Sequence, residues 1–328
     1  MAKVVRTDRE LEVPAVDAGL RADGHELVLL ADGVSESDLI RAVRHATLLL
    51  MCYTPVTRRV IESAEKLKGI VKYGVGLDAI AIDAARDRGI PVANVPEYAE
   101  ETVAEGAFAL MMALAKNHKG IEKVMSREGW TWPERRWLAS DLAGKTVGIV
   151  GLGRIGTSFA RMAAGLRMRV RSYDPHVKGT EKDLRAMLAE CDFLSIHCVL
   201  NAETRHLIGE AELRAMRPSA FLINVSRGAI VDEMALLNAL REKRIAGVAL
   251  DVYSHEPLAR EGHPLSELYA MDNVILSPHL TFYTHEAMAR LEAETLERCR
   301  EVLEGRPLTV KSRDPRLRAQ ERGVRFSD

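Results

Sequence analysis

Short apolar runs alternate with amphipathic stretches through the first hundred residues of the chain. Short apolar runs are typical of buried strands, whereas apolar positions that recur every three or four residues are typical of helices. Ser35 or Ser37 is the expected cap of the first helix. The alternation favours a parallel sheet covered by helices. Strands are predicted at residues 27–30, 48–52, 70–73 and 92–94, and helices at residues 37–45, 57–64 and 80–88.

The middle of the chain contains one stretch that is apolar over most of its circumference. Residues 100–117 contain TVAEGAFALMMALAKN, which predicts a helix packed on more than one side. Such a helix can connect two domains or form a subunit contact. The later segment Gly129–Leu138 holds all three tryptophans and is expected to be an irregular loop with aromatic anchors.

A second series of apolar runs again alternates strands with helices. Its rhythm fits a doubly wound dinucleotide-binding domain. Another helix is expected at residues 286–304. The charged tail at residues 311–328 is poor in apolar residues, so we expect it to be mobile, with wrapping around a neighbouring subunit as the alternative. The six strands are predicted at residues 147–150, 170–173, 193–197, 221–224, 247–251 and 274–276.

A glycine turn follows the first strand of this second series. Gly151, Gly153 and Gly156 have G-x-G-x-x-G spacing between an apolar strand and an amphipathic stretch, the context of a dinucleotide-binding fingerprint. The first glycine allows a tight turn, the second lets a pyrophosphate approach, and the third lets the helix lie close to the strand. The helix N-terminus offers free N–H groups to the phosphates. The sequence therefore predicts nucleotide binding.

Asp174 ends the next strand and bears on the choice of coenzyme. A carboxylate there accepts hydrogen bonds from both ribose hydroxyls of NAD and repels the extra phosphate of NADP. His176 and Lys178 follow and can soften this discrimination. In the alternative interpretation, the Asp-Pro pair only starts a turn. We expect NAD as the coenzyme.

Composition narrows the possible partners and compartment. Lys and Arg number 46 against 47 Asp and Glu, so no net field attracts nucleic acid or an anionic membrane. The cysteines lack CxxC spacing, which favours reduced thiols over disulfides or a zinc site. The N-terminus has no apolar signal core, and no apolar run is long enough to span a bilayer. These features predict a soluble cytoplasmic protein without a metal site.

Three side chains that suit acid–base chemistry follow strands of the second series. Arg227, beside Gly228, which is expected to be flexible, can hold a carboxylate through two hydrogen bonds, or form a surface ion pair. Glu256 follows Asp251 in a loop; one of the two acids can hold a cofactor amide while the other orients a base, and the alternative is a solvated loop. His279 can exchange a proton near neutral pH, or be a core histidine.

These three residues together indicate one reaction. Ligands of open α/β sheets bind at the carboxyl ends of the strands, where all three side chains are expected. Hydride transfer to an α-keto acid needs a cation for the acid end, a proton for the oxygen and a carboxylate that orients the proton donor. Arg227, His279 and Glu256 can supply these in that order.

Several motifs occur in a fixed order along the chain: GLGRIG, Asp174, NVSRGAIVD, DVYSHEP and SPH. In this order they closely resemble the D-isomer-specific 2-hydroxyacid dehydrogenase family. Residues 67–78, LKGIVKYGVGLD, resemble the substrate loop of that family, and residues 94–105 resemble the passage into its interdomain helix. The resemblance covers nearly the whole chain.

The resemblance implies an α/β fold of two Rossmann-like doubly wound domains. Residues 1–98 plus 286–328 would form a flavodoxin-like substrate domain from both chain ends, and residues 99–285 would form the NAD-binding domain. A cleft between the two domains would close on the substrate. Members of the family are commonly dimers, so a homodimer joined through the nucleotide-binding domain is expected.

The resemblance also implies roles for individual residues. Arg227 would grip the substrate carboxylate, His279 would donate the proton during reduction, and Glu256 would bond to His279 and favour its imidazolium form. Asp251 would contact the nicotinamide amide. The implied substrate-binding residues are Lys72, Tyr73, Gly74, Val75 and Gly76. The implied cofactor-binding residues are Gly151, Gly153, Arg154, Ile155, Gly156, Asp174, Thr204, Val225, Arg227, Asp251 and His279.

Lys72 and several departures from the family pattern affect the substrate. A basic side chain at Lys72 can meet the distal end of the substrate, which suggests a second anionic group there; the alternative is a solvated lysine at a strand end. Val199 stands where many relatives have proline, and Gly106 where they often have histidine or another larger residue. Many relatives have a small residue after the catalytic histidine, where this chain has Leu-Thr-Phe-Tyr at residues 280–283, and Phe282 and Tyr283 can narrow the pocket. The sequence therefore does not name the substrate.

The expected activity is the interconversion of a D-2-hydroxy acid and its 2-keto acid with NAD. An NAD-sensing corepressor is the alternative from another class, because the same fold can serve as a binding module. Phosphite dehydrogenase is an enzymatic alternative. A formate dehydrogenase is disfavoured, because that class does not use a proton-exchanging Glu–His pair like the one expected at Glu256.

Overall fold

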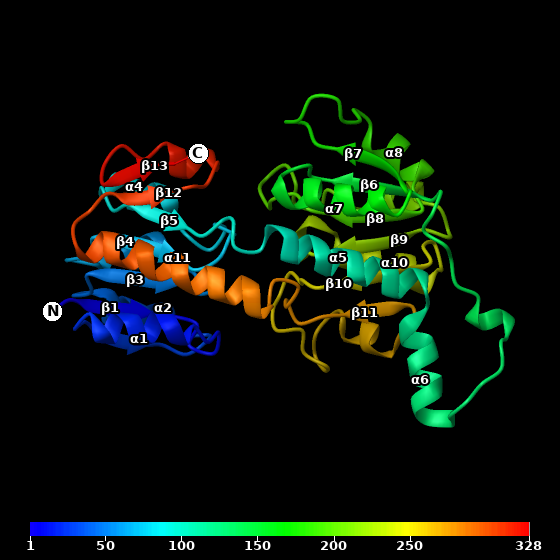
Figure 1. Cartoon of the computed structure of the whole chain (residues 1–328), viewed down its shortest axis with the longest axis horizontal. Coiled ribbons are helices and arrows are strands. Elements are labelled where there is room, and N and C mark those ends of the chain that lie inside the picture. The colour runs from blue at the N-terminus through cyan, green and yellow to red at the C-terminus, as the bar shows by residue number, and fades with distance from the viewer. Residues whose placement is uncertain (328) are drawn as a thin grey trace. The chain divides into compact units, whose positions relative to one another are not determined.

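The computed structural model describes residues 1–327 and divides the chain into two compact units (Figure 1). The first unit comprises Met1–Ala99 and Thr284–Asp328, and the second comprises Glu100–Tyr283. The domain limits implied by the family resemblance differ from these limits by one or two residues.

A five-stranded parallel sheet forms the centre of the first unit. Its strand order, β2-β1-β3-β4-β5, is the flavodoxin-like order that the family resemblance implies. β3 and β4 are buried along their whole length, although β4 ends in Lys72. The strands are β1 (Lys3–Arg6), β2 (Glu26–Leu29), β3 (Leu48–Met51), β4 (Gly69–Lys72) and β5 (Val92–Asn94).

Five helices of the first unit surround this sheet, and most begin at a hydrogen-bonding cap. Ser35 accepts a hydrogen bond from the N–H of Asp38, so Ser35 is the cap of α2. β1 and α1 were not among the expected elements, because β1 is four residues long with charged ends. The helices are α1 (Pro14–Ala22), α2 (Glu36–Val43), α3 (Arg58–Ser63), α4 (Ile82–Asp87) and α11 (His285–Leu303).

The C-terminal tail is folded, so the expectation of a mobile tail was wrong. β12 (Leu308–Val310) pairs in parallel with β13 (Val324–Phe326), and the short helix α12 (Pro315–Arg318) lies between them in the chain. The side chain of Gln320 accepts a hydrogen bond from the N–H of Val92 at 2.7 Å and donates to the Val92 carbonyl at 2.9 Å. Polar contacts of this kind leave no apolar pattern in the sequence.

Replacement of Gln320 by alanine is expected to lower the free energy of unfolding by about 1–3 kcal/mol, because it leaves buried backbone groups of Val92 unpaired. Urea denaturation followed by circular dichroism measures this change. Glu321→Ala, at the exposed neighbouring position, is the matched control. Equal stability of the two variants would contradict the docking of the tail on β5.

A six-stranded parallel sheet forms the centre of the second unit, and its strands lie where the sequence predicts them. The strand order is β11-β10-β9-β8-β6-β7. β7 and β8 lie on opposite sides of β6, so the direction of winding reverses at the carboxyl ends of β6 and β8. This is the place where open α/β sheets bind ligands. The strands are β6 (Thr146–Val150), β7 (Arg169–Tyr173), β8 (Phe193–Ile196), β9 (Phe221–Asn224), β10 (Gly247–Leu250) and β11 (Val274–Leu276).

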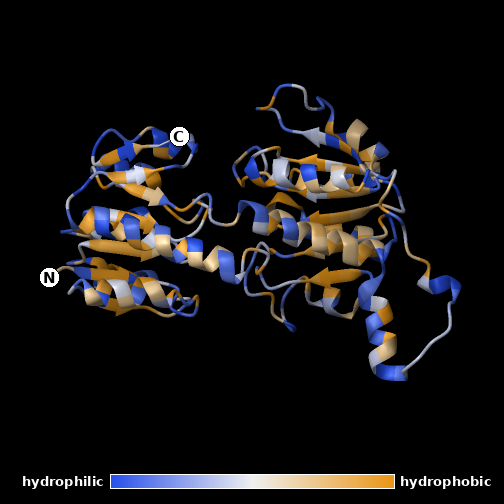
Figure 2. Cartoon of the chain, viewed as in Figure 1, coloured by the Kyte–Doolittle hydropathy of each residue, from blue (hydrophilic) through white to orange (hydrophobic). Residues whose placement is uncertain are grey.

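Helices cover both faces of this sheet, and two separate apolar clusters lie beneath them. α5 packs against α7 and lies over β9 and β10 (Figure 1). Most strands are strongly hydrophobic, whereas the helices carry mixed faces (Figure 2). The helices are α5 (Glu100–Ala115), α6 (His118–Glu128), α7 (Arg154–Gly165), α8 (Leu184–Glu190), α9 (Glu210–Ala215) and α10 (Glu233–Arg241).

α5 ends two residues before the predicted limit, and a further helix, α6, follows it. Asn117 has a left-handed backbone (φ 49°) and separates the two helices. α6 was not predicted, because most residues of HKGIEKVMSRE are polar. None of the helices within residues 1–327 is long and apolar enough to cross a membrane.

Candidate active site

The glycine turn between β6 and α7 has the geometry expected of a pyrophosphate site. Gly151 has φ +90°, and a Cβ there would lie 2.4 Å from the backbone N of Cys198. A Cβ at Gly156 would lie 2.1 Å from the carbonyl oxygen of Gly151, so that helix and turn touch directly. A Cβ at Gly153 would meet open space. The second glycine therefore leaves room beside the helix N-terminus for the phosphates of a dinucleotide.

The N-terminus of α7 supplies hydrogen-bond donors next to that space. α7 begins at Arg154, so the N–H groups of Arg154 and Ile155 lie in the first turn, which has no acceptors within the helix. The Nε of Arg154 lies 3.1 Å from a carboxylate oxygen of Glu100, at the start of α5. This donor set suits a pyrophosphate, and NAD would be held here.

Asp174 lies at the end of β7 beside the same turn. Its carboxylate accepts a hydrogen bond from the N–H of Leu152 at 2.8 Å and one from the N–H of His176 at 3.0 Å. The Asp-Pro turn of the alternative interpretation is therefore present, and the carboxylate lies against the glycine turn as well. The contact of Asp174 with the ribose of NAD remains a prediction.

Two further expected coenzyme contacts follow β8 and β9. Thr204 closes the loop after β8: its hydroxyl donates to the carbonyl of Val199 at 2.6 Å and accepts from the N–H of Asn201 at 2.8 Å. Val225 directly follows β9 and is 7% exposed. Contacts of these two residues with the coenzyme remain predictions.

The loop that carries Arg227 is fixed from within. Asn224 accepts from the N–H of Ser226 at 3.0 Å and donates to the carbonyl of Arg227 at 2.9 Å. A Cβ at Gly228 would lie 2.0 Å from the carbonyl carbon of Tyr253. Gly228 is therefore needed for close approach of two loops, rather than for flexibility, and it brings the loop of Arg227 against the loop that leads to Glu256.

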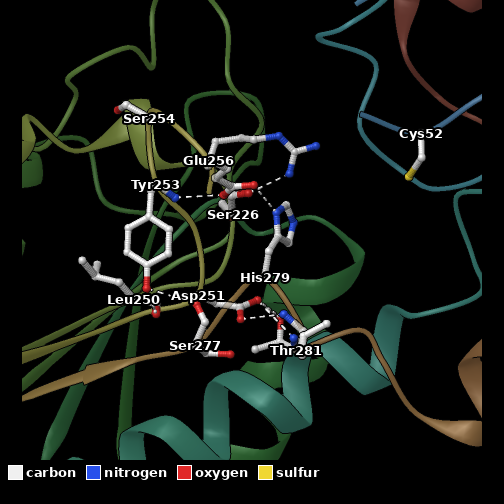
Figure 3. A network of polar contacts seen from close by, with 12 residues as sticks. Cys52, Ser226, Leu250, Asp251, Tyr253, Ser254, Glu256, Ser277, His279 and Thr281 are labelled. Carbon is white, nitrogen blue, oxygen red and sulfur yellow. Dashed lines mark hydrogen bonds and ion pairs between the residues drawn. The ribbon is translucent and has the colours of Figure 1, made fainter. Parts of the chain in front are cut away.

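Glu256 and His279 form the central contact of the site. The Nδ1 of His279 lies 2.9 Å from an oxygen of Glu256, and the two side chains point toward one another (Figure 3). The side chain of His279 is 22% exposed, and that of Glu256 is 32% exposed. A carboxylate on Nδ1 fixes the orientation of the ring and leaves Nε2 for proton exchange.

The electrostatics of this contact keep Glu256 ionised. Burial raises the pKa of Glu256, but the hydrogen bond and charge of His279, the N–H of Tyr253 and the charge of Arg227 together lower it below its ordinary value. Arg227 is therefore close enough to act on Glu256 through its charge. The three residues predicted to carry the chemistry occur together in the second unit.

Asp251 is fully buried at the end of β10. One oxygen accepts from the N–H of Leu280 at 2.9 Å, and the other accepts from the N–H of Thr281 at 3.1 Å and from its hydroxyl at 2.6 Å (Figure 3). Asp251 thus holds the residues after His279. Its contact with the nicotinamide amide remains a prediction.

Tyr253 is a structural contributor that the sequence analysis did not single out. Its hydroxyl donates to the carbonyls of Leu250, at 3.2 Å, and Ser277, at 3.0 Å, and so joins the ends of β10 and β11. Burial raises the pKa of Tyr253 above its ordinary range, so the hydroxyl remains a donor. The sequence signal that could have identified Tyr253 is its position shortly after an apolar strand, directly behind Asp251 and Val252.

The predicted substrate loop lies in the first unit, after β4. The hydroxyl of Tyr73 donates to the carbonyl of Thr7 at 2.6 Å, and burial raises the pKa of Tyr73. Gly74 has φ +153°, and the carbonyl of Val75 accepts from Asn94 at 2.7 Å. The side chain of Val75 is 38% exposed. The loop through Gly76 is therefore anchored at its base and accessible at its tip.

Lys72 is buried, so the alternative of a solvated lysine was wrong. It is 5% exposed, and its ammonium donates to the carbonyl of Cys52 and lies 3.3 Å from the sulfur of that residue. The ammonium also lies 5.3 Å from the centre of the Tyr53 ring. Lys72 therefore links the ends of β3 and β4.

Comparison with known proteins adds independent information. The family model described as "D-isomer specific 2-hydroxyacid dehydrogenase, NAD binding domain" matches residues 108–281. A glyoxylate reductase of Thermococcus litoralis is 40% identical over 275 residues, which cover 79% of this chain and 82% of the relative. A D-3-phosphoglycerate dehydrogenase of Synechocystis is 37% identical over 284 residues, which cover 84% of this chain and 50% of the relative.

A solved structure shares the whole architecture. The D-lactate dehydrogenase of Aquifex aeolicus, crystallised with NAD and lactic acid, matches with a TM-score of 0.83 and 29% identity, and the match covers 92% of this chain and 96% of the other. The family model covers more than half of the chain, and the relatives match most of its length. The chain belongs to the D-isomer-specific 2-hydroxyacid dehydrogenase family.

Proposed function

We propose that this protein is an NAD-dependent dehydrogenase that interconverts a D-2-hydroxy acid and its 2-keto acid. The observation that carries the proposal is the hydrogen bond of 2.9 Å between His279 and Glu256. The positive charge of Arg227 acts on the same carboxylate and lowers its pKa. A carboxylate-oriented imidazole beside a guanidinium provides both a proton and an anchor for an α-keto acid.

His279, Glu256 and Arg227 have separate roles in the proposed reaction. Bound NADH supplies a hydride to the keto carbon. In this direction, Nε2 of His279 gives a proton to the keto oxygen, while Glu256 holds Nδ1 and stabilises the imidazolium. Arg227 binds the substrate carboxylate and places positive charge near the oxygen that becomes negative. Oxidation of the hydroxy acid returns the proton to Nε2.

A small 2-keto acid with one carboxylate is the substrate class that we favour. The ammonium of Lys72 is engaged by Cys52, which argues against the earlier expectation of a second anionic group at Lys72. The N–H groups near Val75 and Gly76, in the accessible tip of the substrate loop, are the proposed further contacts for the carboxylate. Glyoxylate and pyruvate are suitable test substrates with one carboxylate. Phosphorylated keto acids are the test substrates with a second anionic group.

A panel of keto acids tests this function. We expect NADH oxidation, followed at 340 nm, with glyoxylate, pyruvate or hydroxypyruvate, and a lower kcat/KM with 3-phosphohydroxypyruvate. The reverse order would restore the role of Lys72 in binding a second anion. Binding of NADH without turnover of any keto acid would favour the corepressor, and reduction of NAD by phosphite would favour a phosphite dehydrogenase.

Asp174→Asn is expected to reduce the preference for NADH over NADPH by about tenfold or more. Asparagine keeps an acceptor for Leu152 but loses the charge-assisted bonds to ribose and the repulsion of a 2′-phosphate. The ratio of kcat/KM for the two coenzymes measures this effect. Asp141→Asn, at an exposed carboxylate that pairs with Lys116, should leave the ratio unchanged. An unchanged ratio in Asp174→Asn would remove this role.

We also propose that the protein is a cytoplasmic homodimer joined through the second unit. Trp130, Trp132 and Leu138 are each at least 75% exposed in the segment after α6, and a second copy of the chain would cover them. Light scattering after gel filtration is expected to give twice the chain mass. The double variant Trp130→Ser/Trp132→Ser should shift the mass toward the monomer, and Met234→Ser, at another exposed apolar position, should not.

A further inference from the structure

The backbone at His279 has a conformation that side-chain-bearing residues rarely adopt. Its φ is +59°, in the left-handed region, although His279 is neither glycine nor asparagine. Such residues persist where the surrounding structure over-determines them, and they cluster at active sites. The direction of the imidazole therefore depends on the groups that hold this turn.

The first of these groups is Asp251. Its buried carboxylate receives the N–H groups of Leu280 and Thr281 and the hydroxyl of Thr281, all within 3.1 Å (Figure 3). The residues that follow His279 are thereby tied to the end of β10. Leu280 contributes only its backbone N–H, whereas Thr281 contributes both its N–H and its side-chain hydroxyl to Asp251.

The second group is the backbone of α5 at Gly106. A Cβ at Gly106 would lie 2.7 Å from Cβ and 2.9 Å from Cγ2 of Thr281. Real Cβ atoms are essentially never found so close to another atom, so the side chain of Thr281 fills the space that a residue at Gly106 would need. Thr281 is thus held between α5 on one side and Asp251 on the other.

We infer that Thr281 and Gly106 form an interlocking pair that sets the direction of the His279 imidazole, with Thr281 as a positioning residue for the reaction. This inference rests on the proposed function. The absence of a side chain at Gly106 then has an explanation: it makes room for Thr281.

The pair acts on catalysis through the contact of His279 with Glu256. A shift of the turn by an ångström would lengthen the 2.9 Å bond at Nδ1 and turn Nε2 away from its target. Misplacement of this size can cost about a hundredfold in rate. Phe282, edge-on to the imidazole with ring centres 6.2 Å apart, would move with the turn.

Three variants of the full chain test the inference. Gly106→Ala forces a Cβ against Thr281 and should lower kcat by about tenfold or more, with the dissociation constant for NADH within about twofold of the parent. Thr281→Gly should lower kcat similarly, because it frees the turn. In the double variant, the alanine at 106 no longer meets Cβ and Cγ2 of Thr281, and only the Cα of residue 281, at 3.2 Å, remains close. The alanine should therefore cost much less in the Thr281→Gly background than it does alone.

A spectroscopic readout separates positioning from a general loss of fold. With ¹⁵N-labelled histidine, the Nδ1 proton of His279 should give a downfield resonance, assigned by its loss in His279→Ala. This resonance should disappear or shift in Gly106→Ala and Thr281→Gly. Thr281→Val, which keeps the bulk and loses the hydroxyl, should shift it less and is the variant to use if Thr281→Gly does not fold.

Gly165→Ala is the matched control, because Gly165 is also helical and a Cβ there meets nothing within 4 Å. It should leave kcat and the resonance unchanged. Normal kcat and an unshifted resonance in Gly106→Ala, or additive losses in the double variant, would overturn the inference. Full turnover by His279→Ala would instead overturn the proposed function, so the two failures are distinguishable.

Discussion

Replacement of His279 by alanine is expected to lower kcat by about 10²–10⁴-fold while the dissociation constant for NADH changes little. The imidazole is the proton donor of the proposed reaction, and Glu256 orients it through a bond of 2.9 Å. Without it, water must protonate the keto oxygen without a fixed orientation. Stopped-flow NADH oxidation measures the rate, and quenching of protein fluorescence measures coenzyme binding.

His255→Ala is the matched control for this change. His255 is exposed in the same loop as Glu256, and its ring lies edge-on to His263 at 6.4 Å between centres. This variant should keep its turnover. Comparable turnover by His279→Ala and the parent would exclude the imidazole as the proton donor.

Arg227→Lys is expected to lower kcat/KM by about 10²–10³-fold, even though the positive charge is kept. A guanidinium presents two parallel donors to a carboxylate, and an ammonium cannot reproduce this fork. The backbones of the Arg227 loop and the Tyr253 loop already touch at Gly228. The backbone therefore cannot move to bring the shorter lysine side chain closer to the substrate. Both a raised KM for the keto acid and a lowered kcat are expected, because the same residue also polarises the oxygen.

Arg244→Lys provides the control for this substitution, since Arg244 forms an exposed ion pair with Glu242. Its kinetic constants should match those of the parent. An unchanged KM for keto acids in Arg227→Lys would refute the proposed carboxylate contact. Melting curves of both variants exclude a loss of folded protein as the cause.

Much of the second unit could be predicted from the sequence, because its signals are local. Most strands of its sheet are apolar runs, with β7 (RVRSY) as the exception, and Gly151, Gly153 and Gly156 mark the turn by their spacing alone. The order of Arg227, Glu256 and His279 after successive strands was enough to expect them together. Parallel strands place their carboxyl ends on one edge, whatever the details of the loops.

The remaining features depend on contacts between residues far apart in the chain. The bonds of Gln320 to Val92 span 228 residues, and nothing near Gln320 in the sequence indicates them. The burial of Lys72 depends on the carbonyl of Cys52, a backbone atom without any sequence signature. Gly228 was interpreted as flexible, whereas its real constraint is the backbone of Tyr253 on a neighbouring loop.

The folded tail also has a consequence for how this chain avoids aggregation through the edge of its first sheet. β5 is the last strand of its sheet, and an uncovered strand of this kind offers unpaired backbone groups to any other chain. β12 packs beside β5, and the amide of Gln320 occupies both backbone groups of Val92. A chain that ended at residue 310 would keep its glycine turn and its histidine, yet it would expose part of this border. Such a truncated protein would be prone to aggregate while its active-site residues remained intact.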